Sequence, residues 1–311
     1  MAIKYSETNI TSVVKDWYKT ATDLLQDETF GKSLTESNDF LKDELNKLDD
    51  KDSLTKAKNV YAFIRDHFTC NDFDDKWLSQ TLKKTYQTKV GNVADINLLL
   101  CAMLNKAGFK VAPVLLSTTD NGKAEEGLAL LSQYNYVIVK LKIAESVYYL
   151  DASRPKLGFA SLTPDCYNGY ARLIDELPVL VKLEPDSIMD ANLVSITLLN
   201  DSSNFMSGRY YKKLGKYSSL SLRNNLGNKK QEEIGKELSQ GLPSSFSCSN
   251  FAIDSLQQYE EPIQITYDVK LKEDDLDQDI IYFNPMLSEG IKKKSFCFCR
   301  AKISRRNALL P

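Results

Sequence analysis

Hydrophobic residues in the first part of the chain recur at helical spacing. From Ser53 onward, apolar side chains return every three or four positions, at Ala57, Val60, Tyr61, Ile64 and Phe68. This spacing places them on one face of a helix, which the pattern predicts to be core-facing and to end near residues 70–72. The charged segment 11–50 repeats apolar residues in the same way and predicts an amphipathic helix, with a second one around 32–48. The apolar positions of the first of these two helices are Val13, Val14, Trp17, Ala21 and Leu24 or Leu25.

Another helix is expected to begin directly after Gly91. Asn92 suits the N-cap, because its side chain can accept a hydrogen bond from a free backbone N–H group. Asp95 suits the third helical position, where the positive end of the helix favours its charge. Gly108 suits the end of the helix. The apolar face between these signals consists of Val93, Ile96, Leu99, Leu100, Met103, Leu104 and Ala107.

Runs of β-forming residues follow this helix. Three of them cover 111–117, 134–142 and 147–151, and the turn-forming Asp120-Asn121-Gly122 separates the first two. Together they predict an α+β unit in which helices pack on an antiparallel sheet. After about residue 183 the pattern changes to strands with one helical stretch near 217–240, which indicates a separate β-rich domain. The strands predicted there cover 191–200, 205–212, 246–254, 262–271, 279–283 and 295–303.

Composition removes several classes of partner. Of the 311 residues, 40 are Lys or Arg and 42 are Asp or Glu, so no net positive field attracts nucleic acid or an anionic membrane. The longest apolar run, 96–104, is interrupted by Asn97 and is far shorter than the ~20 residues that span a bilayer. The chain begins without the basic and apolar segments of a secretion signal. Its six cysteines are too sparse for a disulfide scaffold and leave the redox compartment open.

Three short sequences occur in an informative order. They are Gly-Asn-Val-Ala-Asp-Ile-Asn-Leu-Leu-Leu at 91–100, Tyr-Asn-Tyr-Val-Ile-Val at 134–139 and Tyr-Tyr-Leu-Asp-Ala-Ser at 148–153. This order resembles the transglutaminase-like superfamily, whose fold is papain-like. It looks closest to the branch found in large exported bacterial proteins of unknown function. The resemblance implies a helical segment at 1–54, a transglutaminase-like core at 55–182 and a β-rich, sandwich-like domain at 183–311, and it implies export.

The superfamily's chemistry needs three groups. A cysteine opens the central helix, where the helix dipole stabilises its thiolate, and a histidine oriented by an aspartate moves the proton. Carried over by the resemblance, the cysteine position falls on Val93 and the aspartate position on Asp151. The histidine position falls on Tyr136, or on Asn135 if the alignment slips by one residue. Valine is no nucleophile, and the chain's one histidine, His67, precedes these motifs.

Other candidate residues have simpler interpretations. His67 is expected to be a packed or half-buried side chain, and Cys101 a buried thiol on the apolar central helix. Cys297 and Cys299 alternate with phenylalanines on a predicted strand, but without further ligands they indicate a metal only weakly. The acidic stretch 273–279 lacks the spacing of a calcium loop. No metal or cofactor is therefore expected.

Asp151 and Tyr136 form the pair of greatest interest. A buried carboxylate needs a hydrogen-bond donor, and a tyrosine hydroxyl can supply one where the family has histidine. These two residues, with Asn92 and Asn135, are the candidates for ligand binding.

Three functions stay open from the sequence. The leading one is a non-catalytic binding or scaffold module for a protein or polymer partner, with no role in nucleic-acid binding or membrane insertion. The second is an active cysteine-dependent peptidase or amide transferase that uses an atypical nucleophile. The third is an architectural segment of a longer exported protein.

Overall fold

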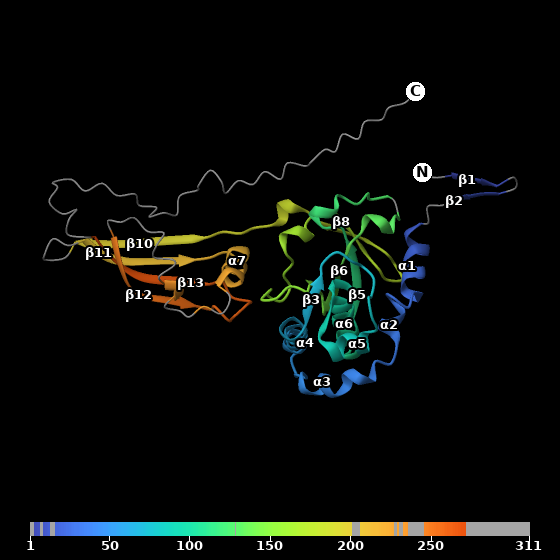
Figure 1. Ribbon diagram of the computed structural model, residues 1–311, viewed down its shortest axis with the longest axis horizontal. Coiled ribbons are helices and arrows are strands. Elements are labelled where there is room, and N and C mark those ends of the chain that lie inside the picture. Colours follow the sequence, from blue (N-terminus) through green and yellow to red (C-terminus); the bar gives the residue numbers. More distant parts are fainter. Residues whose placement is uncertain are drawn as a thin grey trace, which may run out of the picture. The chain divides into compact units, whose positions relative to one another are not determined.

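The chain divides into two compact units (Figure 1). The computed structural model describes residues 3–6, 9–12, 16–127, 129–200, 206–226, 229, 233–235 and 246–271. One unit contains residues 1–193, 213–227 and 254–264, and the other contains 194–212, 228–253 and 265–311. The chain therefore passes between the units more than once. The domain borders expected near residues 54 and 183 stay predictions.

The N-terminal part of the first unit differs from the long helices expected over 11–50. Strands β1 (Ile3–Ser6) and β2 (Asn9–Ser12) pair antiparallel, so residues 11 and 12 are not helical. Helix α1 (Trp17–Gln26) begins only after Asp16, whose side chain accepts a hydrogen bond from the Lys19 N–H group. Val13 and Val14 lie outside the described residues.

The second helix expected there, around 32–48, is broken into short pieces. They are α2 (Lys32–Thr35), the 3-10 turn η1 (Asp39–Leu41) and α3 (Lys42–Lys47). The break occurs at Asn38, whose φ of 43° is left-handed and whose side chain donates to the Ser33 carbonyl oxygen at 2.9 Å. A helix cannot continue through this conformation. The sequence pattern that predicted a helix here could not reveal the break.

Helix α4 (Ser53–His67) confirms the core-facing helix expected from Ser53. Three elements that were not predicted from the polar sequence between residues 69 and 92 follow it. They are β3 (Thr69–Asp72), α5 (Leu82–Thr88) and β4 (Val90–Asn92). Strands β3 and β4 pair in parallel and place Cys70 opposite Gly91. This pairing brings the end of α4 next to the start of the central helix.

The central helix α6 (Val93–Lys106) is buried along nearly its whole length. The Asn92 side chain accepts from the Asp95 N–H group at 2.7 Å, and the Asp95 carboxylate accepts from the Asn92 N–H group at 2.9 Å, so the predicted N-terminus is confirmed. Gly91 allows this close approach, since a Cβ atom there would lie 2.6 Å from that of Asp95. Gly108 follows the helix with a φ of 93°.

A five-stranded antiparallel sheet packs against α6, in the order β7-β6-β5-β8-β9. The predicted strands are confirmed as β5 (Lys110–Leu116), β6 (Tyr136–Ile143) and β7 (Ser146–Leu150). The short strands β8 (Gly169–Leu173) and β9 (Leu180–Leu183) were not predicted. Helices on an antiparallel sheet are the α+β architecture expected of the core. Its topology places Tyr136 at the beginning of β6 and Asp151 directly after β7.

The second unit is built on a four-stranded sheet in the order β10-β11-β13-β12. Its strands are β10 (Leu193–Asn200), β11 (Met206–Lys213), β12 (Phe246–Asp254) and β13 (Gln264–Leu271). The β-rich character expected of this region is confirmed, and a second sheet that would make it a sandwich stays a prediction. The expected strands 279–283 and 295–303, the acidic stretch 273–279, Cys297 and Cys299 lie outside the described residues.

Helix α7 (Lys216–Leu226) and residues 254–264 belong to the first unit. Arg223 holds them together, because its buried guanidinium donates to the carbonyl oxygens of Ser255, Leu256, Gln258 and Glu261. Of the helical stretch expected near 217–240, the described residues are helical in α7 and at 233–235, whereas residue 229 is not helical. Within the described residues, no helix combines the length and the apolar character that crossing a membrane requires.

The reciprocal cap of α6 gives a test of this fold. We expect Asp95→Ala to lower the free energy of unfolding by about 3 kcal/mol, because it removes a cap and leaves the buried N–H group of Asn92 and the partly buried N–H group of Ser79 without an acceptor. Asp16→Ala, at the exposed N-cap of α1, should cost only about 1 kcal/mol. Urea denaturation of both variants measures the difference. Equal losses would show that the Asp95 cap does not organise the core.

Candidate functional site

A buried carboxylate occupies the middle of the first unit. Asp151 has no exposed surface. Its Oδ1 accepts hydrogen bonds from Asn97 Nδ2 at 2.9 Å, Ser153 N at 3.0 Å and Ser153 Oγ at 2.6 Å, and its Oδ2 accepts from the Tyr136 hydroxyl at 2.8 Å. The central helix supplies Asn97, strand β6 supplies Tyr136, and the segment after β7 supplies Ser153. These donors offset the desolvation of the carboxylate and fix its orientation.

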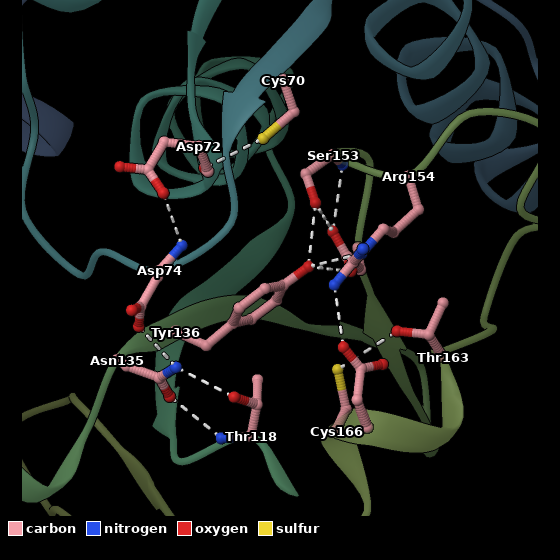
Figure 2. Close-up of polar contacts among 12 residues, drawn as sticks. Cys70, Asp72, Asp74, Thr118, Asn135, Tyr136, Ser153, Arg154, Thr163 and Cys166 are labelled. Carbon is pink, nitrogen blue, oxygen red and sulfur yellow. Dashed lines mark hydrogen bonds and ion pairs between the residues drawn. The ribbon is translucent and has the colours of Figure 1, made fainter. Parts of the chain in front are cut away.

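Tyr136 makes the hydrogen bond to Asp151 that the sequence suggested. Its hydroxyl also lies 3.0 Å from Ser153 Oγ and accepts from Arg154 Nε at 3.2 Å (Figure 2). Burial raises the pKa of the Tyr136 hydroxyl well above its usual value, and the nearby charge of Asp151 adds to this effect. The tyrosine therefore stays protonated at neutral pH and acts as a donor to the carboxylate.

Val93, the first residue of α6, is completely buried. It belongs to an apolar cluster with Tyr136 and Cys166, together with Val114, Leu116, Ile138, Leu162, Ala171, Leu173, Val181 and Leu183. The helix N-terminus at which the resemblance places a nucleophile thus presents methyl groups to packed hydrophobic side chains. This position offers no group that could attack a carbonyl carbon.

Two cysteines that the sequence did not single out lie around the same cluster. Cys166 is a buried member of it, 3.7 Å from Thr163 Oγ1, and burial raises the pKa of its thiol well above the usual value. Cys70 packs against the cluster, donates to the Asp72 carbonyl oxygen at 3.1 Å, and has a pKa raised by burial to about 12. The β3–β4 pairing and the irregular path after Ser153 bring them here, and neither leaves a repeating signal in the sequence.

The remaining candidate thiol and the histidine are elsewhere. Cys101 is buried in α6, and desolvation raises its pKa to about 12. His67 ends α4 and is exposed, so the expectation that it would be half-buried is wrong, although its ring lies 5.0 Å from that of Phe63. Its Nδ1 is 2.9 Å from the Phe63 carbonyl oxygen. Across the described residues, no cluster of three His, Cys, Asp or Glu side chains could hold a metal ion.

A polar pocket with a volume of about 370 Å³ lies next to this buried centre. Its lining consists of Phe73, Asp74, Thr118, Asp120, Asn121, Asn135, Arg154 and Asp165. Of the four ligand-binding candidates, Asn135 lines it, whereas Tyr136 and Asp151 are fully buried behind it. Asn92 caps α6 and donates to the Trp77 carbonyl oxygen at 2.9 Å.

Arg154 connects the pocket to the buried centre. Its guanidinium lies 4.0 Å from the Phe73 ring centroid, and Nη2 donates to Asp165 Oδ2 at 2.8 Å. The Nε donor reaches the Tyr136 hydroxyl, which in turn bonds Asp151. A continuous series of hydrogen bonds therefore runs from the pocket wall to the interior (Figure 2). Nothing in the spacing of Arg154 along the sequence distinguishes it from the other arginines, so it was not predicted as part of the site.

The Tyr136 hydroxyl can be tested separately from its ring. Tyr136→Phe leaves the Asp151 carboxylate without one donor and Arg154 Nε without its acceptor, so we expect the free energy of unfolding to fall by about 1–3 kcal/mol. Tyr149→Phe is the matched control. The Tyr149 hydroxyl has no hydrogen bond within the described residues, so its loss should change stability by less than about 0.5 kcal/mol. Denaturant titration compares them, and a neutral Tyr136→Phe would contradict the geometry.

Comparison with known proteins shows a family to which part of this chain is similar. Residues 40–152 match the model of the transglutaminase-like superfamily. A crystal structure of a proposed protease from Parabacteroides distasonis aligns over 85% of this chain and 54% of its own length, with 12% sequence identity and a TM-score of 0.41. The chain thus spans about half the length of that protein. The curated proteins gave no match. The matched segment includes α6, β5, β6 and β7, so the core of the first unit is similar to the transglutaminase-like superfamily.

Proposed function

We propose that this protein is a non-catalytic transglutaminase-like module that binds a protein or polymer partner. One observation carries the proposal. Val93, at the position where the family resemblance expects the nucleophile, is fully buried, while Tyr136, at the expected position of the base, donates its hydroxyl to Asp151. Of the expected triad, only the aspartate carries its usual functional group.

The proton chemistry supports the same conclusion. A general base must accept a proton near neutral pH, and this requires a pKa close to that range. Burial and the charge of Asp151 raise the pKa of Tyr136, which keeps its proton on the hydroxyl. Asp151 is occupied by donors from three side chains and one backbone N–H group and has no exposed surface through which to meet a substrate. The carboxylate therefore acts as a structural hydrogen-bond acceptor.

The alternative of an active thiol enzyme needs a reactive cysteine. Cys70 and Cys166 are close to the former active centre, but burial raises the pKa of both thiols and so disfavours the nucleophilic thiolate. A histidine partner is also missing, since His67 is the chain's one histidine and lies exposed at the end of α4. The arrangement therefore favours binding over acyl transfer.

The third alternative, an architectural segment of a longer exported protein, concerns the context of the module. Export is implied only by the resemblance of the sequence to the exported branch. The near balance of 40 basic and 42 acidic side chains favours neither nucleic acid nor an anionic membrane as partner. A purely architectural segment is expected to bind no ligand in its pocket. Detectable ligand binding at the pocket beside Asn135 and Arg154 therefore separates the two ideas.

Thiol reactivity tests the proposal. We expect Cys70, Cys101 and Cys166 of the native chain to resist iodoacetamide at neutral pH, because burial raises their pKa values. Each should be alkylated readily after unfolding in urea, which is the internal control. Mass spectrometry of the digested protein assigns the label to individual cysteines. Raising the pH should accelerate labelling of half-buried Cys70 first, because a larger fraction becomes thiolate as the pH approaches 12.

One result would remove the proposal in favour of the enzyme. It is rapid native-state alkylation of Cys70 or Cys166 at neutral pH that slows when Arg154, the cation near both thiols, is replaced by Met. Such a result would identify a thiolate stabilised at the centre of the site.

A further inference from the structure

The pocket beside Asn135 has a lining that restricts what it can bind. Among its lining residues only Phe73 is apolar, and the Arg154 guanidinium already lies over that ring at 4.0 Å from the centroid. An apolar ligand would therefore gain little here. A volume of about 370 Å³ lies within the range of roughly 300–1,000 Å³ that small-molecule sites occupy.

The polar groups of the pocket are held in place before any ligand arrives. The Asn135 side chain donates to Asp74 Oδ1 at 2.8 Å and to Thr118 Oγ1 at 2.9 Å, and accepts from the Thr118 N–H group at 2.9 Å. Arg154 is fixed by Phe73, Asp165 and the Tyr136 hydroxyl. Fixed polar groups lose little conformational entropy on binding, which favours recognition of a specific ligand.

Donors and acceptors remain available on these fixed side chains. Asp74 and Asp165 each use one carboxylate oxygen in the bonds to Asn135 and Arg154, so the second oxygen of each can accept. Asp120, on the exposed turn η2 (Thr119–Asn121), has both carboxylate oxygens available within the described residues. Arg154 keeps its Nη1 donors. The pocket thus presents several strong acceptors beside one cationic donor.

This mixture of signs disfavours charged ligands. A carboxylate or phosphate would approach three aspartates, whereas an ammonium group would satisfy the acceptors but meet the guanidinium of Arg154 and leave its free donors unpaired. A hydroxyl group donates to a carboxylate and accepts from a guanidinium at the same time. Several hydroxyl groups on a compact, uncharged framework match the lining best.

We infer that this pocket binds an uncharged carbohydrate, with vicinal hydroxyl groups donating to the free oxygens of Asp74, Asp120 and Asp165 and accepting from Arg154. The inference rests on the proposed function, because it names the ligand class of the same non-catalytic module. The inference also explains the series of hydrogen bonds from Asp151 through Tyr136 to Arg154. Through this series the buried centre fixes the Arg154 guanidinium, which donates to the ligand.

The test uses the full chain and a set of defined oligosaccharides. Saturation-transfer NMR screens neutral oligomers of hexose and N-acetylhexosamine units against oligouronic acids, chitosan oligomers and lysine-containing peptides, and calorimetry gives the Kd of each ligand that binds. We expect binding by neutral oligosaccharides. Asp120→Ala should weaken it about tenfold or more, because it removes a charged acceptor from the pocket lining.

Two further variants keep the result interpretable. Glu145→Ala removes another exposed carboxylate, in the turn between β6 and β7, where the Glu145 side chain is 97% exposed, and it should leave the Kd unchanged. Arg154→Met keeps the apolar stem over Phe73 but removes the donors, and it should abolish binding while circular dichroism shows a folded chain.

Several outcomes would overturn the inference. They are no binding of any neutral oligosaccharide at millimolar concentration, binding restricted to charged oligosaccharides or to lysine peptides, or binding that survives both Asp120→Ala and Arg154→Met. None of these outcomes bears on the reactivity of the cysteine thiols. Failure of carbohydrate binding therefore does not contradict the proposal that the module is non-catalytic. Conversely, rapid alkylation of Cys70 or Cys166 defeats that assignment whatever the pocket binds.

Discussion

The Asp151 carboxylate has no contact with solvent, and the first unit is organised around the cost of burying it. An unpaired carboxylate at this depth would destabilise the protein by several kcal/mol, so the surrounding elements must supply donors. Asn97 from α6, Tyr136 from β6 and Ser153 after β7 supply them. Asn97 also accepts from the Ala152 N–H group and donates to the Val137 carbonyl oxygen, so the same network joins the helix to the sheet.

Under the proposed function, the same requirement gives this site a structural role in place of a catalytic one. In the family's chemistry an aspartate orients a histidine, and the histidine must remain free to move a proton. Here a tyrosine fills the position that the resemblance assigns to histidine and satisfies the aspartate with a hydroxyl that keeps its proton. Val93 is the first residue of α6 and is fully buried in an apolar cluster. We propose that binding takes place instead in the polar pocket. Arg154 lines this pocket and is hydrogen-bonded to Tyr136 in the buried centre.

Much of the core could be predicted from the sequence because its signals are local. Apolar spacing identified α4 and α6, and the reciprocal pairing of Asn92 with Asp95 confirmed the start of α6 to the residue. Runs of β-forming residues identified β5, β6 and β7. The hydrogen bond between Tyr136 and Asp151 followed from the need of a buried carboxylate for a donor.

What escaped prediction depends on contacts distant in sequence or on single backbone conformations. The left-handed φ of Asn38 breaks a segment whose side chains still follow a helical pattern. Strand β3 exists because it pairs with β4, some twenty residues later, and only this pairing brings Cys70 near Val93. Arg154 is recognisable as part of the site only from its place against Phe73 and Asp165. Pairings and loop paths of this kind leave no period in one sequence.

The central claim is that this core performs no acyl transfer, and turnover measures that claim most directly. The full chain would be incubated with a mixed library of fluorogenic peptide amides, with and without an added amine, and product formation followed over time. We predict no release above the rate of a Cys70→Ser, Cys166→Ser double variant. Saturable release or amine incorporation by the unmodified chain, abolished in that double variant, would contradict the account.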